Sequence, residues 1–569
     1  MPGKLFVRVA TWLLLPFILA VLLLGPHHHT SVYASSMPAL AGRVVDSYGQ
    51  AVWRAEVLLY VDEEAAHCAK AESQRDGGFV LDLPGTEMDA LRLVVSHPQF
   101  HPTEWQAGRD DLESLRDGSA VRLPDVVMER RLTAGFWIAV LTFVGILALI
   151  ATGRLHSTMA ALLGVAVVLG VSLVGRPISE GLFILDFEQA IEYVDFGVIF
   201  LVMGMMIVVG IIEETGIFQW MAYQAYRLSR GRVWLLVIIL MLLTSVASAL
   251  LDNVTTMLLV APITLQIALT LGVDPLSLLV PEMLASNVGG ISTLIGTPTN
   301  ILIGSYAGMA FNDFLSNLTP GVLMAQVALS LYVLLFYRKD YRAAGAAASP
   351  ALLERLRENA RITQPEKLRR AGVVFLLILA LFVFGEQVHL EPAVTAILGA
   401  VATLLVVRAD IQEMLRVVDW TTLMFFIALF IVVGAIQEVG LISYIAAGLG
   451  YVVGENLLLA TLLTSWATAL LCLAIPTIPL AAALLPVVGF LTDGIPGAKN
   501  NVLYYGLSVG SALGANMSLV GATNNLVTAG IAQRAGYPIT YARFLKVGLP
   551  AALVTMAVGT LWLLIRFYF

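Results

Sequence analysis

From residue 133 onward, apolar residues fill the chain almost continuously, and polar residues are confined to short breaks between them. A helix of about 20 apolar residues crosses the hydrocarbon core of a bilayer. The pattern therefore predicts an all-α polytopic membrane protein. The predicted spans are 133–152, 157–174, 195–213, 281–304, 320–337, 372–386, 392–407, 419–436, 502–530 and 547–567.

Two further apolar stretches, 233–271 and 456–491, are each nearly twice as long as one span requires. Polar residues and prolines near the middle of each stretch indicate a turn. Most lysines and arginines fall on one side, the cytoplasmic side, only if both stretches enter and leave by the same face. We therefore predict two re-entrant hairpins. The clusters on that side are Arg154; Arg227, Arg230 and Arg232; the loop 338–370; Arg408 and Arg416; and Arg534, Arg543 and Lys546, with Arg176, Lys499 and Arg566 as exceptions.

Composition agrees with this class, because 58% of the residues are hydrophobic and only 13% are charged. The mean hydropathy is +0.85, and soluble domains contain about 25% charged residues. With no HExxH or GxSxG motif and no paired intramembrane acids, we expect no enzyme. The two cysteines, Cys68 and Cys472, indicate neither a disulfide framework nor a metal site. We expect no cofactor, only Na⁺ or H⁺ as a coupling ion.

The N-terminal part has a different pattern. Its apolar stretch 11–24 is either an uncleaved first span or a secretory signal. Residues 37–128 have ordinary soluble composition, with strand-like alternation around a "DSYGQ" turn. Together with "RDGGFVLDLP" and "VSHPQF", this order resembles the carboxypeptidase regulatory-like, or transthyretin-like, β-sandwich. Such modules are binding or stabilising accessories.

We expect five parts in a multi-pass protein of the plasma (inner) membrane. They are 1–36, a signal or first span; 37–130, an extracytoplasmic β-sandwich; 131–337, a first transmembrane repeat; 338–371, a cytoplasmic linker; and 372–569, a second transmembrane repeat.

The two halves match each other in sequence. Residues 195–218 align with 419–442, and 286–304 align with 511–530 one residue further out of step. The positions of the lysines and arginines give the two copies opposite orientations across the membrane. Inverted repeats with interrupted helices are typical of secondary transporters, whose site lies near the bilayer midplane. The matched pairs include Asp195/Asp419, Gly210/Gly434, Gly216/Gly440, Pro262/Pro486, Gly289/Gly514, Thr293/Ser518, Gly296/Gly521 and Asn300/Asn525.

The stretch "GGISTLIGTPTNILIG" is predicted to be a broken helix. Pro298 lacks an N–H donor and disfavours helix at Thr297. Broken backbone at membrane depth is tolerated only where it is buried or lines a cavity. Its carbonyl and Ser, Thr and Asn oxygens suit Na⁺, and the following helix N-terminus suits an anion. "VGATNNLV" repeats the arrangement with Thr523, Asn524 and Asn525.

The hairpin tips are the second half of the predicted site. Ser248 and Asp252 are spaced i, i+4, so we expect them to share a helical face. Asp252 is the only carboxylate at either tip, and a buried intramembrane acid is costly, which favours a functional role. At the second tip, Thr477 is the only side-chain donor. The first-tip residues expected to face the broken helix are Ser248, Asp252, Asn253, Thr255 and Thr256.

These motifs, "ALLDNVTTMLLVAPITL", "SNVGGISTLIGTPTNILIG" and "GANMSLVGATNNLVTAGIAQRAGYPITYARFL", resemble signatures of the ion transporter superfamily. That superfamily includes the P protein, the arsenite-pump membrane subunit, the citrate-transporter-like permeases and, more distantly, the divalent anion:sodium symporters. The resemblance covers about 133–569. It implies a scaffold, an elevator-type transport domain and a homodimer.

The resemblance and the broken-helix pattern supply candidate site residues. The relatives typically carry Asp-Asn at the second hairpin, where this chain has Pro476 and Thr477, so a second tip carboxylate is missing. The candidates for ion binding are Ser248, Asp252, Asn253, Gly296, Thr477 and Ala522. The candidates for substrate binding are Asn253, Thr255, Thr297, Asn300, Thr477, Thr523, Asn524 and Asn525.

The leading hypothesis is a secondary active transporter that moves a small anion or organic acid, of the di- or tricarboxylate kind, coupled to Na⁺ or H⁺. A Na⁺/H⁺ antiporter that titrates Asp252 and an arsenite-type efflux permease are alternatives. A third alternative is a membrane-embedded sensor that uses the β-sandwich. The expected partners are the substrate and the lipid bilayer, with no nucleic acid.

Overall fold

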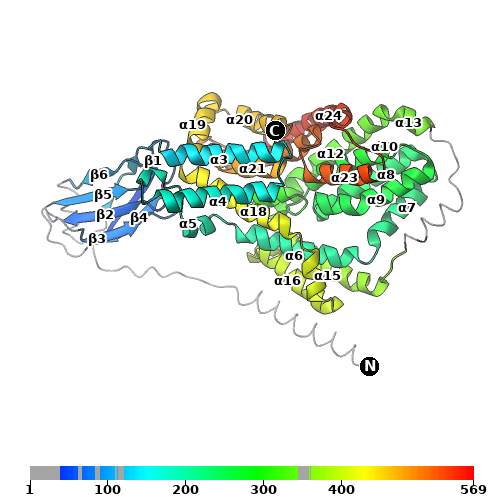
Figure 1. Ribbon diagram of the computed structural model, residues 1–569, viewed down its shortest axis with the longest axis horizontal. Helices are drawn as coiled ribbons and strands as arrows, with labels where there is room; N and C mark the ends of the chain where they lie inside the picture. The colour runs from blue at the N-terminus through cyan, green and yellow to red at the C-terminus, as the bar shows by residue number, and fades with distance from the viewer. Residues whose placement is uncertain are drawn as a thin grey trace, which may run out of the picture.

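The structure, a computed structural model, describes residues 39–61, 67–83, 90–108, 112, 121–343, 358 and 361–568. A β-sandwich lies at one end of the molecule and joins a much larger body of helices (Figure 1). The predicted signal or first span within 1–36 lies outside the described residues, and so do residues 344–357, 359 and 360 of the predicted cytoplasmic linker.

The sandwich consists of two four-stranded sheets. One has the order β4–β1–β7, with β8 also paired to β1, and the other has the order β3–β2–β5–β6. Alternate residues of both sheets point inward and form one apolar core, which includes Leu40, Leu59, Phe79 and Leu93. The strands are β1 (Ala39–Asp46), β2 (Glu56–Val61), β3 (Ala69–Glu72), β4 (Gly78–Asp82), β5 (Leu91–Ser96), β6 (Thr103–Gln106), β7 (Val121–Arg122) and β8 (Val126–Met128).

Two turns that the sequence predicts define the sandwich. In "DSYGQ", Asp46 Oδ1 accepts hydrogen bonds from the backbone N–H groups of Tyr48 and Gln50, both at 2.9 Å. In "DGGF", Gly77 has φ +80°, and a Cβ there would lie 2.4 Å from the Val44 carbonyl oxygen. Only glycine fits this position, because it tolerates both the left-handed backbone and the close approach.

Ten of the described helices are long and apolar enough to span a membrane. The protein is therefore a multi-pass membrane protein of mostly helical fold. The helices of the first half are α3 (Ala134–Ala151), α4 (Ser157–Gly175), α5 (Phe187–Glu192), α6 (Phe196–Glu213), α7 (Ile217–Ser229), α8 (Val233–Leu250), α9 (Asn253–Leu271), α10 (Leu276–Gly290), α11 (Pro298–Ala307) and α12 (Phe311–Phe336). After α13 (Arg338–Ala343), the second half has α15 (Pro365–Phe384), α16 (Pro392–Val407), α17 (Ile411–Val417), α18 (Trp420–Glu438), α19 (Leu441–Val453), α20 (Leu457–Leu471), α21 (Thr477–Gly494), α22 (Val502–Gly514), α23 (Thr523–Arg534) and α24 (Tyr541–Tyr568).

The long apolar stretches are helical hairpins, as predicted. The first is α8 and α9 with a turn at 251–252, and the second is α20 and α21 with a turn at 472–476. The predicted span 281–304 consists of two half-helices, α10 and α11, and the predicted span 502–530 consists of α22 and α23. The amphipathic helices α7 and α19, which precede the hairpins, were not predicted, because each has only 13 residues and is too short to appear as a span.

Several contacts between a helix of the first half and a helix of the second half occur twice, with the roles of the two halves exchanged. Helix α4 contacts α18 and α16 contacts α6, while α9 contacts α23 and α11 contacts α21. A Cβ at Gly210 would meet Val417, and a Cβ at Gly434 would meet Tyr193. Gly434 follows Gly210 by 224 positions, and Val417 follows Tyr193 by the same 224 positions. A glycine of each repeat thus receives a residue of the other repeat, which is what a two-fold relation between two copies requires.

Backbone conformations and helix caps repeat in the same way. Gly216 and Gly440 begin α7 and α19 with φ values of +78° and +86°. The carboxylates of Asp195 and Asp419 cap α6 and α18. The repeat therefore extends from sequence to backbone geometry.

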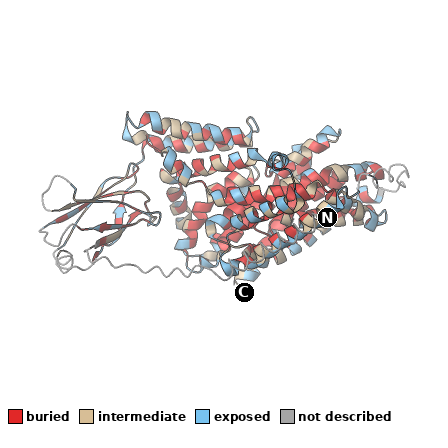
Figure 2. Ribbon diagram, turned by 90° about the horizontal axis from the view of Figure 1, so that it is seen from below, coloured by how far each residue is buried: buried red, intermediate tan, exposed pale blue. Residues whose placement is uncertain are grey.

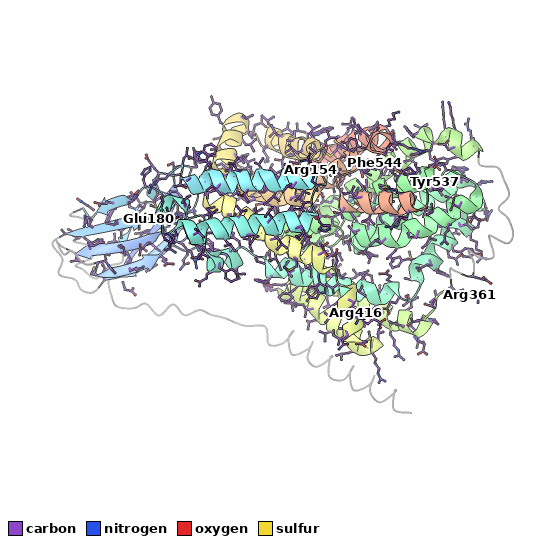
Figure 3. All side chains as sticks on the ribbon, viewed as in Figure 1. Arg154, Glu180, Arg361, Arg416, Tyr537 and Phe544 are labelled. Carbon is purple, nitrogen blue, oxygen red and sulfur yellow. The ribbon has the colours of Figure 1, made fainter. Side chains whose placement is uncertain are left out.

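Burial is concentrated in the middle of the helical body (Figure 2). Every residue of α10 and of α22 is buried. Glu180 lies beside the sandwich, whereas Arg154, Arg361 and Arg416 lie away from it (Figure 3). These three arginines, which were predicted to share one side, are thus remote from the β domain.

The sandwich is attached to the helical body by a buried arginine. Arg130 Nε donates to Asp46 Oδ2 at 3.0 Å, and the Asp46 side chain is fully buried. The same guanidinium donates to the Glu438 carbonyl oxygen at 3.4 Å and to Ser443 Oγ at 3.1 Å. A Cβ at Gly440 would lie 2.2 Å from the guanidinium, so this glycine is needed for the contact as well as for its positive φ.

A second set of contacts joins the sandwich to the segment before α6. Arg54 forms a salt bridge with Glu192 at 3.0 Å, and Trp53 packs edge-on against Tyr193 with 5.5 Å between ring centres. The Tyr193 hydroxyl donates to Glu438 Oε1 at 2.6 Å. These contacts fix the sandwich on the ends of α5 and α18.

A cavity of about 660 Å³ lies between the sandwich and the helices. Its walls combine sandwich residues with α6, α11, α18 and α21, and they include His97, Tyr306 and Pro486. Burial, and then the charge of Arg130, lowers the pKa of His97 to about 3. The imidazole is therefore neutral at pH 7, and its 3.9 Å approach to Glu438 Oε2 is a polar contact rather than an ion pair.

Arg130→Met should lower the free energy of unfolding of the sandwich by about 3 kcal/mol, because it leaves the buried Asp46 carboxylate without its cation. Thermal unfolding of the full chain, followed by the circular-dichroism signal of the β-strands, measures this change. Arg122→Met removes an exposed arginine of the same domain and should leave the transition unchanged. Equal unfolding temperatures for the two variants would contradict the role of Arg130.

Candidate functional site

The first hairpin tip differs from the predicted geometry at Asp252. The expectation that Ser248 and Asp252 share one helical face is wrong, because α8 ends at Leu250 and the backbone at Leu251 and Asp252 is extended. The half-buried Asp252 instead caps α9. Its Oδ1 accepts from the N–H groups of Val254 and Thr255 at 2.8 and 2.9 Å, and the Thr255 hydroxyl donates to Oδ2.

Asn253, the first residue of α9, makes the contact with the interior that was expected of Asp252. Its Oδ1 accepts from Ser248 Oγ, and its Nδ2 donates to Asn287 Oδ1 at 3.0 Å. A Cβ at Gly290 would lie 2.6 Å from Asn253 Oδ1. The hairpin tip therefore packs directly on the end of α10.

Asn287 links the first half of the molecule to the second. Its Nδ2 also donates to Asn516 Oδ1 at 2.8 Å and to Asn525 Oδ1 at 3.3 Å. A further bond runs in the other direction, from Ser508 Oγ to Asn300 Oδ1 at 2.6 Å. All of these side chains are buried. The two repeats thus share one network of amide and hydroxyl groups at the centre of the body.

Asn300 and Asn525 hold the two helix breaks in equivalent ways. Asn300 Nδ2 donates to the carbonyl oxygens of Gly290, Ile291 and Thr293 at 3.4, 3.1 and 2.9 Å. Asn525 Nδ2 donates to the carbonyl oxygens of Ala515 and Ser518 at 3.1 and 3.2 Å. The amide groups of both residues are therefore engaged within the protein.

The remaining predicted residues lie at these same junctions. A Cβ at Gly296 would lie 2.4 Å from the Gly290 carbonyl oxygen and 2.8 Å from that of Ser248. The N–H of Thr477 donates to the Gly521 carbonyl oxygen at 3.0 Å, which ties the second hairpin tip to the second break. Thr297 caps α11, buried Ala522 precedes α23, and Thr523 is exposed at its start.

The two halves differ in how their helix N-termini are capped. In the first half, the side chains of Asp252 and Thr297 accept from first-turn N–H groups of α9 and α11. In the second half, Pro476 and Ala522 stand before α21 and α23, and neither provides a side-chain cap. Since the first N–H groups of a helix have no partner within it, the second half retains more donors for a ligand.

Asn524 and Thr256 have buried polar atoms without partners. Asn524 is the second residue of α23 and is 1% exposed, and neither its amide oxygen nor its amide nitrogen has a hydrogen bond in the described part of the chain. The same holds for the hydroxyl of Thr256, in the first turn of α9, which packs against α23. A buried amide without partners costs free energy, so these atoms indicate where a polar ligand fits.

Several residues of the network were not predicted, namely Ser286, Asn287, Ser508 and Asn516. Asn287 aligns with Ala512, and Asn516 aligns with Ile291. A comparison of the two repeats selects positions that match, so it passes over these two asparagines, each of which only one repeat has. The signal that could have found them is an asparagine inside an apolar span, which is costly unless it is paired.

Comparison with known proteins finds a family match within the helical body. Residues 147–500 match the CitMHS family, described as citrate transporter. The chain belongs to this family. It is a membrane transporter of the ion transporter group, in agreement with the resemblance found in its motifs.

Relatives support this family assignment. An uncharacterized transporter of Mycobacterium tuberculosis is 35% identical over 432 residues, which cover 76% of this chain and 98% of that protein. The human P protein is 33% identical over 510 residues, which cover 75% of this chain and 59% of the P protein. Among solved structures, the YdaH transporter of Alcanivorax borkumensis aligns over 76% of this transporter and 99% of its own chain, with a TM-score of 0.48 and 17% identity.

Asn524 and Asn525 are adjacent asparagines with opposite expected behaviour. Asn524→Ala should leave the stability of the transporter unchanged and lower transport roughly tenfold or more, since it removes only unpaired atoms. Asn525→Ala should lower the free energy of unfolding by about 2 kcal/mol, because the Ala515 and Ser518 carbonyl groups lose their donor. Thermal unfolding in detergent and uptake into proteoliposomes measure the two effects. A stability loss for Asn524→Ala equal to that for Asn525→Ala would show that Asn524 is a structural residue.

Proposed function

We propose that this transporter is a secondary active carrier of a small organic anion, of the di- or tricarboxylate class, coupled to Na⁺ or H⁺. The observation that supports it most directly is the buried, unpaired amide of Asn524 at the uncapped N-terminus of α23. A carboxylate accepts hydrogen bonds from such donors, and a helix N-terminus favours its negative charge. The family description as citrate transporter agrees with this substrate class.

The proposed anion site has no cationic side chain of its own. Residues 233–308, 457–498 and 500–533 contain no lysine, arginine or histidine. An anion bound between α21 and α23 would therefore be held by N–H groups and amides alone. A coupling cation bound nearby would supply the missing positive charge, which is a physical reason for coupled transport.

We place that coupling cation on the first half. Asp252 is the only carboxylate at either hairpin tip, and it stands half-buried at the N-terminus of α9. The Thr255 hydroxyl contacts Asp252, and Ser248 and Asn253 bond to each other on the interior side of the same tip. Their hydroxyl and amide oxygens are hard ligands suited to Na⁺. A proton on Asp252 is the alternative form of the same coupling, and exchange of Na⁺ for H⁺ there would make the protein an antiporter.

An elevator movement is the proposed route across the membrane. We define the inner group as α8–α12 together with α20–α24, and the outer group as α3–α6 together with α15–α18. Buried hydrogen bonds from Asn287 and Ser508 join both repeats within the inner group, so it would move as one body. Side-chain bonds between the groups include Ser305 to Asp195 and Asn312 to the Val383 carbonyl oxygen. These bonds would have to break during the movement.

Uptake of a panel of radiolabelled dicarboxylates, tricarboxylates and arsenite into proteoliposomes tests the proposal. The expected result is uptake of one or more carboxylates driven by an inward Na⁺ gradient or pH gradient, and loss of that uptake when the gradient is collapsed. Flux of Na⁺ driven by a pH gradient in the absence of carboxylate would favour the antiporter. Arsenite as the only solute transported would contradict the organic anion.

Asp252→Asn tests the position of the coupling ion. Asparagine is as good an N-cap as aspartate, so α9 and the fold should be retained. We expect the variant to lose at least tenfold of its gradient-driven uptake while it keeps the wild-type unfolding temperature. If every flux and its ion dependence are unchanged in Asp252→Asn, Asp252 has no coupling role.

A further inference from the structure

A second acid, Glu282, lies inside the inner group and takes no part in the site described above. It belongs to α10 and is 0% exposed. Its Oε1 accepts from the Thr264 hydroxyl of α9 at 2.8 Å. Its Oε2 is buried and has no hydrogen-bond partner among the residues that the structure describes. A carboxyl group so placed has one satisfied oxygen and one that is free.

Glu282 is close to the asparagine network. Ser286 follows it by four residues on the same helix and so lies on the same face, one turn away. Ser286 Oγ lies 3.2 Å from Ser248 Oγ, and Ser248 in turn donates to Asn253. A line of polar side chains therefore runs from Glu282 to the first hairpin tip.

The second repeat shows that the fold does not require an acid here. Glu282 aligns with Leu507 of α22, and Thr264 aligns with Val488 of α21. Both of these residues are buried in the apolar core. Replacing two hydrogen-bonded partners by apolar groups of similar shape is close to neutral for stability. The same scaffold thus accepts an apolar pair at this position, while the first repeat keeps a costly polar pair.

Among the residues that the structure describes, no cation pairs with Glu282. The elements packed against α10 are α8, α9, α12, α22, α23, α24 and the short helix Ala515–Met517. Helices α8 and α9, the short helix and the rest of α10 contain no titratable residue. The titratable residues on the others are Asp313 and Tyr332 on α12, Tyr504 and Tyr505 on α22, Arg534 on α23, and Tyr541, Arg543, Lys546, Arg566 and Tyr568 on α24.

None of these groups forms a hydrogen bond or ion pair with Glu282 in the described residues. Arg534, Arg543, Lys546 and Arg566 are exposed. Asp313 caps α12, the Tyr332 hydroxyl donates to the Val547 carbonyl oxygen, and Tyr505 bonds to Asn317. A carboxylate without a counter-ion in this setting is strongly disfavoured, so the group is neutral and carries a proton in this conformation.

We propose that Glu282 is a proton-binding site of the transport cycle, which takes up one proton from water on one side of the membrane and releases it on the other. The proposal rests on the proposed transport function and adds a residue and an ion to it. The carboxylate accepts one proton to form the neutral acid that this buried setting favours. The charged form requires water or a cation at Oε2, which a different position of the inner group would admit.

Two transport measurements on the full-length protein in proteoliposomes test the proposal. One is carboxylate uptake driven by an inward pH gradient, and the other is exchange of labelled for unlabelled carboxylate at equal pH, which needs no net proton movement. Glu282→Gln should lose gradient-driven uptake at least tenfold and keep exchange within about threefold of the wild type. The substitution leaves the neighbouring Pro281 in place, and the unfolding temperature of the variant shows whether it is folded.

The double variant Glu282→Leu with Thr264→Val is the matched control, because it copies the pair found in the second repeat. It should fold as stably as the wild type and show the same loss of gradient-driven uptake. Gradient-driven uptake by Glu282→Gln with the wild-type dependence on pH would overturn the proposal. So would a double variant that fails to fold, because the acid would then be structural.

An infrared measurement separates this proposal from the proposed function. The wild type should show the carbonyl-stretch band of a protonated carboxylic acid at neutral pH, and Glu282→Gln should lack it. A wild type that transports carboxylates without that band would overturn the proton site and leave the transport function standing. A wild type that shows the band but transports no member of the panel would overturn the proposed function.

Discussion

Hydrogen bonds from two asparagine side chains to broken backbone are the interaction on which the centre of this protein depends. A helix break at membrane depth leaves carbonyl groups that water cannot satisfy. Asn300 and Asn525 supply donors to these groups at equivalent positions of the two repeats. With the breaks stabilised in this way, the N-termini of α11 and α23 can point into the interior, and the hairpin tips can pack on the breaks through Asn253 and Thr477.

Much of this arrangement could be predicted from the sequence. The hairpins follow from apolar stretches of double length, and the breaks follow from Pro298 and its glycine-rich surroundings. The family resemblance lies in the same motifs. The repeat follows from glycine, asparagine and proline that recur at offsets of 224 and 225 residues, and the structure confirms the repeat with matched caps and positive φ values.

Other features could not be predicted in this way, for physical reasons. The direction of the Asp252 side chain depends on where α8 ends, and helix ends are poorly defined by hydropathy. Asn287 and Glu282 each have an apolar counterpart in the other repeat, so a search for matches does not find them. The Arg130 contact with Glu438 joins residues 308 positions apart, and no local pattern contains it.

The differences between the repeats carry the functional content of the fold. The acids, Asp252 and Glu282, both belong to the first repeat, and the uncapped helix N-termini belong to the second. A duplicated scaffold thus holds groups suited to a cation in one copy and groups suited to an anion in the other. The shared asparagine network lies between them and joins both copies to one buried centre.

That network has a consequence for how the chain is assembled. The acceptors of Asn287 Nδ2 lie 229 and 238 residues after Asn287 in the chain. The donor to Asn300 Oδ1 lies 208 residues after Asn300. During synthesis, the first repeat enters the membrane with the Asn287 Nδ2 and Asn300 Oδ1 atoms unpaired, and these two atoms gain their partners only when the second repeat arrives. Completion of the asparagine network is therefore a late event in biogenesis, and the order of synthesis leaves the first repeat dependent on the second to pair these buried atoms.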